Sequence, residues 1–208
     1  MIPLFVDCTD KRIVIFGGGE VASRKAAYFS READVLVISR SFSKKLTALP
    51  VQREVLDVSE VPDTEIARII RKAFLVIGTL PDPSLNNRIG NICQDLKILF
   101  NNADGKAGDV IIPSVTRGNN YVLAISTKGS SPAISRFIRE QIEMHYPELD
   151  DMISLQQDMR ELLKHKEPSQ ARRNAILGEI LHDQAVWEMV KKDPDEARSQ
   201  LRRRYLHE

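Results

Sequence analysis

The chain has 208 residues, of which 42% are hydrophobic and 28% charged, and its formal net charge is +1. These values exclude a disordered or fibrous chain, and the length is enough to bury the core of one or two domains. A nearly neutral chain has no bulk attraction to nucleic acid or to membranes, so any anionic ligand must be bound by local groups.

Cysteine usage and hydropathy narrow the class further. Cys8 and Cys93 are far apart and have no second cysteine at ligand spacing, so we expect neither a disulfide framework nor a structural zinc site. Residues 1–12 lack a basic region followed by a long apolar stretch, and no later segment has the roughly 18 apolar residues of a membrane span. We therefore expect a cytoplasmic protein that binds no membrane and no nucleic acid.

The first hundred residues alternate short apolar runs with amphipathic stretches. Short, continuously apolar strands separated by helices indicate a parallel sheet that is covered on both faces. This is the α/β pattern of a Rossmann-type doubly wound sheet, and we assign it to a domain at residues 1–112. We expect strands at 12–16, 34–39, 51–56, 73–78 and 97–100, and helices after Gly19 and at roughly 41–49, 60–71 and 83–94.

The pattern changes after residue 100. Residues 109–114 and 121–126 are predicted strands, and the polar turn 117–120 between them is too short for a parallel crossover, so the pair should be antiparallel. Ser130, Ser131 and Pro132 then supply an N-cap and a first-turn proline for a helix. We expect residues 113–147 to form a small α+β segment that dimerises through apolar side chains, among them Ile134, Phe137, Ile138 and Ile142.

The last sixty residues are rich in charge and helical in pattern. Pro168 and Pro194 divide them, and the apolar side chains between the two prolines recur at a spacing near 3.6 residues. We predict a small helical C-terminal domain at residues 148–208.

The sharpest local motif is a glycine-rich turn between the first strand and the first helix. Residues 17–22 fit the dinucleotide fingerprint G-x-G-x-x-G/A, with Ala22 in the third position. Gly17 permits the tight turn, Gly19 lets the backbone approach a pyrophosphate, and the helix N-terminus offers N–H groups to the phosphates. The motif predicts a dinucleotide cofactor.

The kind of dinucleotide stays open on this motif. The acidic residue that binds the ribose of NAD is expected at the end of the second strand, about 20 residues further on. Ser39 and Arg40 occupy that place. Arg40 is either a ligand for the 2′-phosphate of NADP or a solvated surface side chain.

Two further groups of residues could take part in binding or catalysis. Residues 101–104 (Asn-Asn-Ala-Asp) follow a strand predicted to end at Phe100, where ligands of open α/β sheets bind. Asp104 there is either a carboxylate for proton transfer or part of an Asp-Gly turn. The loop 126–132, with the basic helix residues Arg136 and Arg139, is either an anion-binding loop or a plain capped turn.

These motifs, in this order, resemble the precorrin-2 dehydrogenase family, which also forms part of multifunctional siroheme synthases. The resemblance covers most of the first 145 residues and is carried by residues 17–25, 100–104 and 112–114 and by the Ser-rich loop 126–132 with its following helix. The chain departs from the family at residues 78–82, where Ala-Thr-Asp is usual, and at Thr127-Lys128-Gly129, where Ser-Gly-Gly is usual.

The resemblance implies NAD as hydride acceptor, precorrin-2 as donor, Asp104 as the residue most tied to catalysis and a homodimer. Some relatives also insert Fe²⁺ into the product. We expect no metal ligands, cofactor contacts from ten residues and substrate contacts from six. The cofactor set is Gly17, Gly18, Gly19, Glu20, Val21, Ala22, Ser39, Arg40, Thr79 and Asn101, and the substrate set is Asn102, Ser126, Thr127, Lys128, Ser130 and Arg136.

Two rival functions fit parts of the pattern. One is an NAD(P)-dependent oxidoreductase of a small alcohol or ketone, although no tyrosine has the lysine four positions later that many such enzymes use. The other is a nucleotide-sensing regulatory domain, which needs the glycine-rich turn but neither Asp104 nor the loop 126–132.

Overall fold

The computed structural model describes residues 2–104 and 108–206. Contacts between residues divide the chain into two compact units, residues 1–112 and residues 113–208. The three-domain division drawn from the sequence, with its further boundary after residue 147, remains a prediction.

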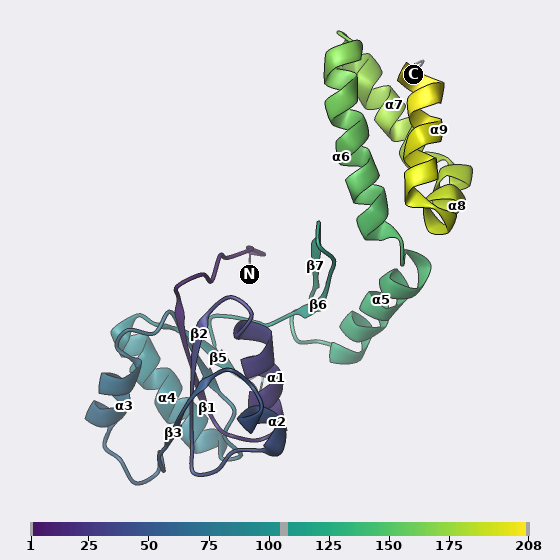
Figure 1. The fold of residues 1–208 in the computed structure, drawn as a ribbon. Helices are drawn as coiled ribbons and strands as arrows, with labels where there is room; N and C mark the ends of the chain where they lie inside the picture. The colour runs from purple at the N-terminus through teal and green to yellow at the C-terminus, as the bar shows by residue number, and fades with distance from the viewer. Residues whose placement is uncertain (1, 105–107, 207–208) are drawn as a thin grey trace. The chain divides into compact units, whose positions relative to one another are not determined.

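The first unit contains a five-stranded sheet in the order β3-β2-β1-β4-β5 (Figure 1). All neighbouring strands are parallel, and Phe16 at the end of β1 lies opposite Ile38 and Gly78. The predicted Rossmann-type α/β class is therefore confirmed. The strands are β1 Arg12–Phe16, β2 Asp34–Ser39, β3 Gln52–Val55, β4 Leu75–Gly78 and β5 Leu99–Asn102.

Helices cover both faces of this sheet because successive strand residues point to opposite sides. Ile13 and Ile15 of β1 pack with the helices α1 and α2, whereas Val14 and Phe16 pack with α3 and α4. All four β1 side chains are fully buried, and each contributes about 1.5–3 kcal/mol by leaving water. The helices are α1 Glu20–Phe29, α2 Lys44–Thr47, α3 Asp63–Ile70 and α4 Pro83–Leu96.

The last strand of the sheet begins and ends two residues later than the sequence suggested. Helix α4 continues to Leu96, and Lys97 ends it in the left-handed conformation (φ 57°). Strand β5 therefore runs from Leu99 to Asn102 rather than from Lys97 to Phe100. The two asparagines belong to the carboxyl end of the strand instead of following it.

The predicted strand at 109–114 is wrong. The N–H groups of Asp109 and Val110 both bond the Phe100 carbonyl, and Val110 and Ile112 pack on the α1 side of the sheet. Val110 and Ile112 are therefore apolar because they pack against the core, and not because they belong to a β-strand. Pro113 has no N–H to donate, and the strand β6 begins only after it, at Ser114.

The second unit opens with a hairpin and a helix. Strands β6 (Ser114–Arg117) and β7 (Val122–Ile125) are antiparallel. The sequence predicted an antiparallel pair here, but with its first strand at 109–114 and with Arg117 in the turn. The Asp150 carboxylate accepts hydrogen bonds from the N–H groups of Asn119 (3.1 Å) and Asn120 (2.7 Å) in the hairpin turn. Helix α5 spans Pro132–His145 and is capped by the predicted Ser131 hydroxyl.

Up to residue 206, the last that the structure describes, the rest of the chain is helical, as its charge and spacing predicted. Its helices are α6 Leu149–Lys166, α7 Gln170–His182, α8 Gln184–Lys192 and α9 Pro194–Leu206. They share one core that includes Met152, Leu155, Ile180 and Leu201. Asp183 ends α7 and caps α8, so the chain changes from one helix to the next there without a proline. Across the described part of the chain, no helix combines the length and the apolar character needed to cross a membrane.

Candidate active site

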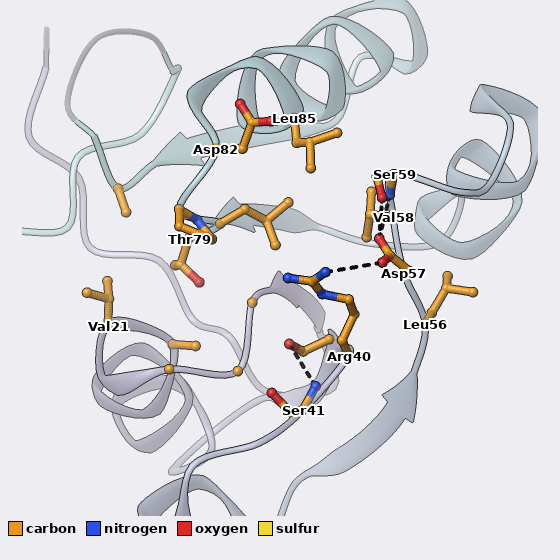
Figure 2. Close-up of a pocket in the computed structure, with 18 of the residues that line it drawn as sticks. Val21, Arg40, Ser41, Leu56, Asp57, Val58, Ser59, Thr79, Asp82 and Leu85 are labelled. Carbon is orange, nitrogen blue, oxygen red and sulfur yellow. Dashed lines mark hydrogen bonds and ion pairs between the residues drawn. The ribbon is translucent and has the colours of Figure 1, made fainter.

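A pocket of about 770 Å³ lies at the carboxyl ends of the parallel strands (Figure 2). This is where ligands of open α/β sheets bind, and the volume is within the range of cofactor sites. Several chain segments far apart in sequence line it. They are residues 17–22, 39–41, 56–59 and 79–82, together with Leu85, Ala103 and Asp104.

The glycine-rich turn forms one wall of the pocket. Gly17 has φ 118°, which favours glycine, and a Cβ there would collide with Thr79. A Cβ on Gly18 would collide with the Ser41 carbonyl. A Cβ on Gly19 would meet no atom within 4 Å, and its φ of −86° suits any residue. The fold itself therefore requires glycine at the first two positions, whereas the third leaves open space for a ligand to approach the backbone.

The N-terminus of α1 is suited to bind a phosphate group. Gly19 is its N-cap and supplies no side-chain hydrogen bond, so the N–H groups of the first turn remain for a ligand. Ser23 is buried and hydrogen-bonds both the Gly19 carbonyl (2.9 Å) and the Ser43 hydroxyl (2.7 Å). These contacts fix the turn against α2, and the turn fits the pyrophosphate of a dinucleotide.

A charged pair also lines the pocket. Figure 2 shows the Arg40 guanidinium reaching the Asp57 carboxylate, 3.5 Å away. The Ser59 hydroxyl (2.6 Å) and the Ser59 N–H (2.9 Å) also donate to Asp57. These two bonds, with a smaller contribution from Arg40, hold the pKa of the Asp57 carboxyl below its ordinary value. Arg40 therefore faces a carboxylate that is already ionised.

Apolar side chains line the pocket beside this pair. They are Leu56, Val58, Leu80 and Leu85, three of which are labelled in Figure 2. A flat apolar face near hydrogen-bonding groups is what an adenine ring requires. The pocket thus has a region for each half of an adenine nucleotide, a polar one for phosphate and an apolar one for the base.

Asp104 lies just past the end of β5, as its place in the sequence suggested. Its N–H bonds the Asn102 side chain (3.1 Å), and its Oδ2 accepts a bond from Asn86 Nδ2 (3.1 Å). The residue is exposed and lines the pocket, whereas Asn86 is fully buried. A carboxylate is therefore held in the lining of the same pocket as the glycine-rich turn.

Asn101 and Asn102 lie outside the lining of the pocket. Both are buried, and Asn101 accepts a bond from Lys25 Nζ (3.0 Å) while donating to the Val110 carbonyl (2.7 Å). Burial, with a smaller contribution from Arg24, lowers the pKa of the Lys25 ammonium to about 8. Asn101 thus joins α1, β5 and the segment that leaves the first unit.

The predicted substrate residues beyond Asn102 belong to the second unit. Within the loop, Ser126 Oγ accepts from the Lys128 N–H, and Thr127 Oγ1 both donates to and accepts from the Ser131 backbone. Arg136 pairs with Glu140 at 2.7 Å. Ser130 precedes the N-cap, and Lys128 has a left-handed backbone (φ 55°). The loop therefore uses several of its polar groups internally.

Sequence reasoning missed Asn86, Asp57 and Lys25 as parts of this region. Asn86 shares a helix face with the buried Ile89 and Cys93, and a polar residue on an apolar face is a signal that was available. Asp57 gave no comparable signal because its role depends on the end of a neighbouring strand. In the described residues, no group of three or more His, Cys, Asp and Glu side chains is placed to hold a metal ion.

The fold and this pocket define a nucleotide-binding domain of the Rossmann type. Residues 4–114 match a family of NAD(P)-binding domains. A solved structure, SirC, a precorrin-2 dehydrogenase, superimposes with a TM-score of 0.72, covering 98% of this chain and 100% of its own at 21% identity. At that identity the likeness shows the fold alone.

One relative that aligns over most of its own length identifies the family, and a second aligns over part of a longer protein. A precorrin-2 dehydrogenase from Methanosarcina barkeri is 42% identical over 191 residues, which are 89% of this chain and 85% of that protein. A siroheme synthase from Neisseria meningitidis is 30% identical over 167 residues, which are 79% of this chain but 34% of that protein. The chain belongs to the precorrin-2 dehydrogenase family.

Proposed function

We propose that this protein oxidises precorrin-2 to sirohydrochlorin with NAD⁺ as the acceptor. The observation that carries the proposal is the 42% identity over nearly the whole length to a precorrin-2 dehydrogenase. The pocket supports it independently, because a glycine-rich dinucleotide turn and a carboxylate both line it. The sensing-domain alternative weakens accordingly, since it does not need Asp104, and the small-substrate oxidoreductase alternative lacks the tyrosine–lysine pair that many such enzymes use.

The reaction moves one hydride and one proton from the substrate. The cofactor, when bound, accepts the hydride at its nicotinamide ring. The backbone of residues 17–19 and the α1 N-terminus would hold its pyrophosphate, and the apolar side chains around Leu85 would hold its base. Asp104 then takes the proton or orients the pyrrole N–H groups of the macrocycle.

The second unit supplies groups suited to bind the substrate and to form a dimer. Precorrin-2 carries many carboxylates, and Lys128 and Arg136 with the hydroxyls of the loop 126–131 are suited to bind them. Exposed apolar side chains on β7 and α5, among them Phe137 (55% exposed), support a homodimer formed by this part of the chain. We place the enzyme in the cytoplasm.

The test is anaerobic incubation of the full chain with NAD⁺ and precorrin-2. NADH absorbance and the sirohydrochlorin spectrum should rise together in equal amounts. Binding of NAD⁺ without turnover would instead favour the sensing domain, and turnover of a small alcohol would favour the other oxidoreductase. A parallel sample with Fe²⁺ added shows whether siroheme forms as well.

A further inference from the structure

The Asn86 side chain connects the cofactor pocket to Asp104. Asn86 lies in the first turns of α4 and is 0% exposed. Its Oδ1 accepts from the Leu80 N–H (3.0 Å), and its Nδ2 donates to the Leu80 carbonyl (2.9 Å) and to Asp104 Oδ2 (3.1 Å). Both amide hydrogens are therefore used within the protein, and Asn86 has none left for a ligand.

Asp104 needs such a partner because its own position is exposed. An exposed aspartate samples several staggered rotamers, and each one puts the carboxylate in a different place. A hydrogen bond from a buried, fixed amide to one oxygen selects a single orientation. The bond leaves the other oxygen of Asp104 available to the pocket that the residue lines.

We propose that Asn86 is a positioning residue that holds the Asp104 carboxylate in its reactive orientation. The inference rests on the proposed function, since it assumes that Asp104 acts on precorrin-2. Leu80 follows Thr79, whose hydroxyl donates to the Phe16 carbonyl (2.8 Å) at the start of the glycine-rich turn. One buried amide thus fixes the carboxylate relative to the wall that binds the cofactor.

The two sets of Asn86 contacts predict different defects. Loss of the Leu80 contacts would disturb a segment that lines the cofactor pocket, so NAD⁺ affinity would fall. Loss of the Asp104 contact would misplace the carboxylate alone. A displacement of about 1 Å costs up to about 100-fold in rate, so turnover would fall with little change in NAD⁺ affinity.

The experiment compares Asn86→Asp and Asn86→Ala with Asn87→Ala, an exposed asparagine next to it on α4. Asn86→Asp keeps an acceptor for the Leu80 N–H but replaces the donor to Asp104. With enzyme in excess over precorrin-2, we expect both Asn86 variants to be about 10- to 100-fold slower. NAD⁺ affinity in calorimetry should stay within about threefold of wild type for Asn86→Asp, which keeps the bond from the Leu80 N–H, and should fall further for Asn86→Ala, which loses both Leu80 contacts. An unchanged rate in either variant, or an equal loss of rate and affinity in Asn86→Asp, would overturn the inference.

A double substitution separates positioning from stability. In an Asp104→Asn background, Asn86→Asp should change the residual rate less than about twofold, because coupled residues are not additive. If Asn86→Asp slowed the Asp104→Asn enzyme by as large a factor as it slows the wild type, Asn86 would act independently of Asp104. If Asp104→Asn alone were as fast as wild type, the proposed role of Asp104 would fail first. If Asp104→Asn were slow but the Asn86 variants were as fast as wild type, the proposed role of Asp104 would stand and only the positioning role of Asn86 would be rejected.

A measurement on the wild-type side chain covers the case in which neither Asn86 variant folds. The side-chain amide resonance of Asn86 should shift when Asp104 is replaced by alanine, because one N–H loses its acceptor. A resonance that does not change would show that the hydrogen bond is absent in solution, and the inference would be rejected.

Discussion

The guanidinium of Arg40 and the carboxylate of Asp57 lie 3.5 Å apart, from the ends of neighbouring strands β2 and β3. Arg40 occupies the place where other dinucleotide-binding domains distinguish NAD from NADP. Asp57 pairs with Arg40 and brings a carboxylate to the same part of the pocket. That carboxylate repels a 2′-phosphate but can accept a hydrogen bond from a ribose hydroxyl, so we expect the pair to favour NAD⁺.

Cofactor choice is therefore the first prediction. Wild-type enzyme should have a higher kcat/KM with NAD⁺ than with NADP⁺. Asp57→Asn should shift this ratio toward NADP⁺ by roughly three- to tenfold, which corresponds to about 0.7–1.4 kcal/mol of charge interaction. Asp82→Asn removes another carboxylate from the pocket lining and should leave the ratio unchanged. A wild-type preference for NADP⁺ would mean that Arg40 binds the 2′-phosphate after all.

The glycine-rich turn gives a second prediction, which depends on two adjacent glycines. Gly19→Val adds side-chain atoms to open space, so stability should change by no more than about 1 kcal/mol, while NAD⁺ affinity falls at least about tenfold. Gly18→Ala would press on Ser41 and Ser39 and should cost about 1–3 kcal/mol of stability.

Calorimetric titration and denaturant unfolding measure these two quantities. Gly178→Val is the matched control, since a Cβ at Gly178 in α7 also meets no atom within 4 Å. NAD⁺ binding by Gly19→Val at wild-type strength would remove the turn from the cofactor site.

The pKa of Lys25 yields a third prediction. Its pKa in the folded protein, about 8, is below the ordinary 10.5, so the unfolded chain binds more protons between these values. Stability should therefore rise as the pH increases through 8, and the burial penalty is fully present below it. From pH 7 to pH 9 the gain is about 1 kcal/mol.

Other groups titrate over the same range, so the comparison uses Lys25→Met. The difference in unfolding free energy between wild type and this variant should move in favour of wild type as the pH rises. A constant difference from pH 7 to pH 9 would show that Lys25 keeps an ordinary pKa in the folded protein.

The sequence predicts features that depend on neighbouring residues, and it does not predict contacts between residues that are far apart in the chain. The β-branched strand at 12–16 and the turn at 17–22 are local patterns, and their geometry follows from chirality and glycine conformation. The start of β5 depends on Lys97, which ends α4 in a left-handed conformation that its residue type does not predict. The contacts Asn86–Asp104 and Arg40–Asp57 join residues 18 and 17 positions apart, so only the packed fold brings them together.

Assembly is the fourth prediction. Phe137 and Ile134 are exposed on α5 and Val122 on β7, and we expect them to lie in a dimer interface. Phe137→Glu should weaken the dimer at least about thirtyfold, the factor for the roughly 2 kcal/mol that a central aromatic contributes. Sedimentation of the wild type and the variant measures this change. Leu181→Glu alters an exposed apolar residue of α7 and serves as control. A wild-type chain that stays monomeric at micromolar concentration would contradict the prediction.

The fifth prediction concerns Asp104, whose carboxylate lines the same pocket as the glycine-rich turn. Asp104→Asn keeps the size of the side chain and its capacity to accept from Asn86, but it removes the charge. Folding and NAD⁺ binding should therefore survive, which unfolding and calorimetry check.

The kinetics of Asp104→Asn then distinguish its two candidate roles. If the carboxylate takes the proton, kcat should fall by roughly 10²–10⁴, the usual contribution of a positioned acid or base. If it orients the macrocycle through the pyrrole N–H groups, KM for precorrin-2 should rise more than kcat falls. Steady-state rates over a range of precorrin-2 concentrations separate the two. A variant with wild-type kcat and KM would show that Asp104 only shapes the turn after β5, and the proton would then leave to water.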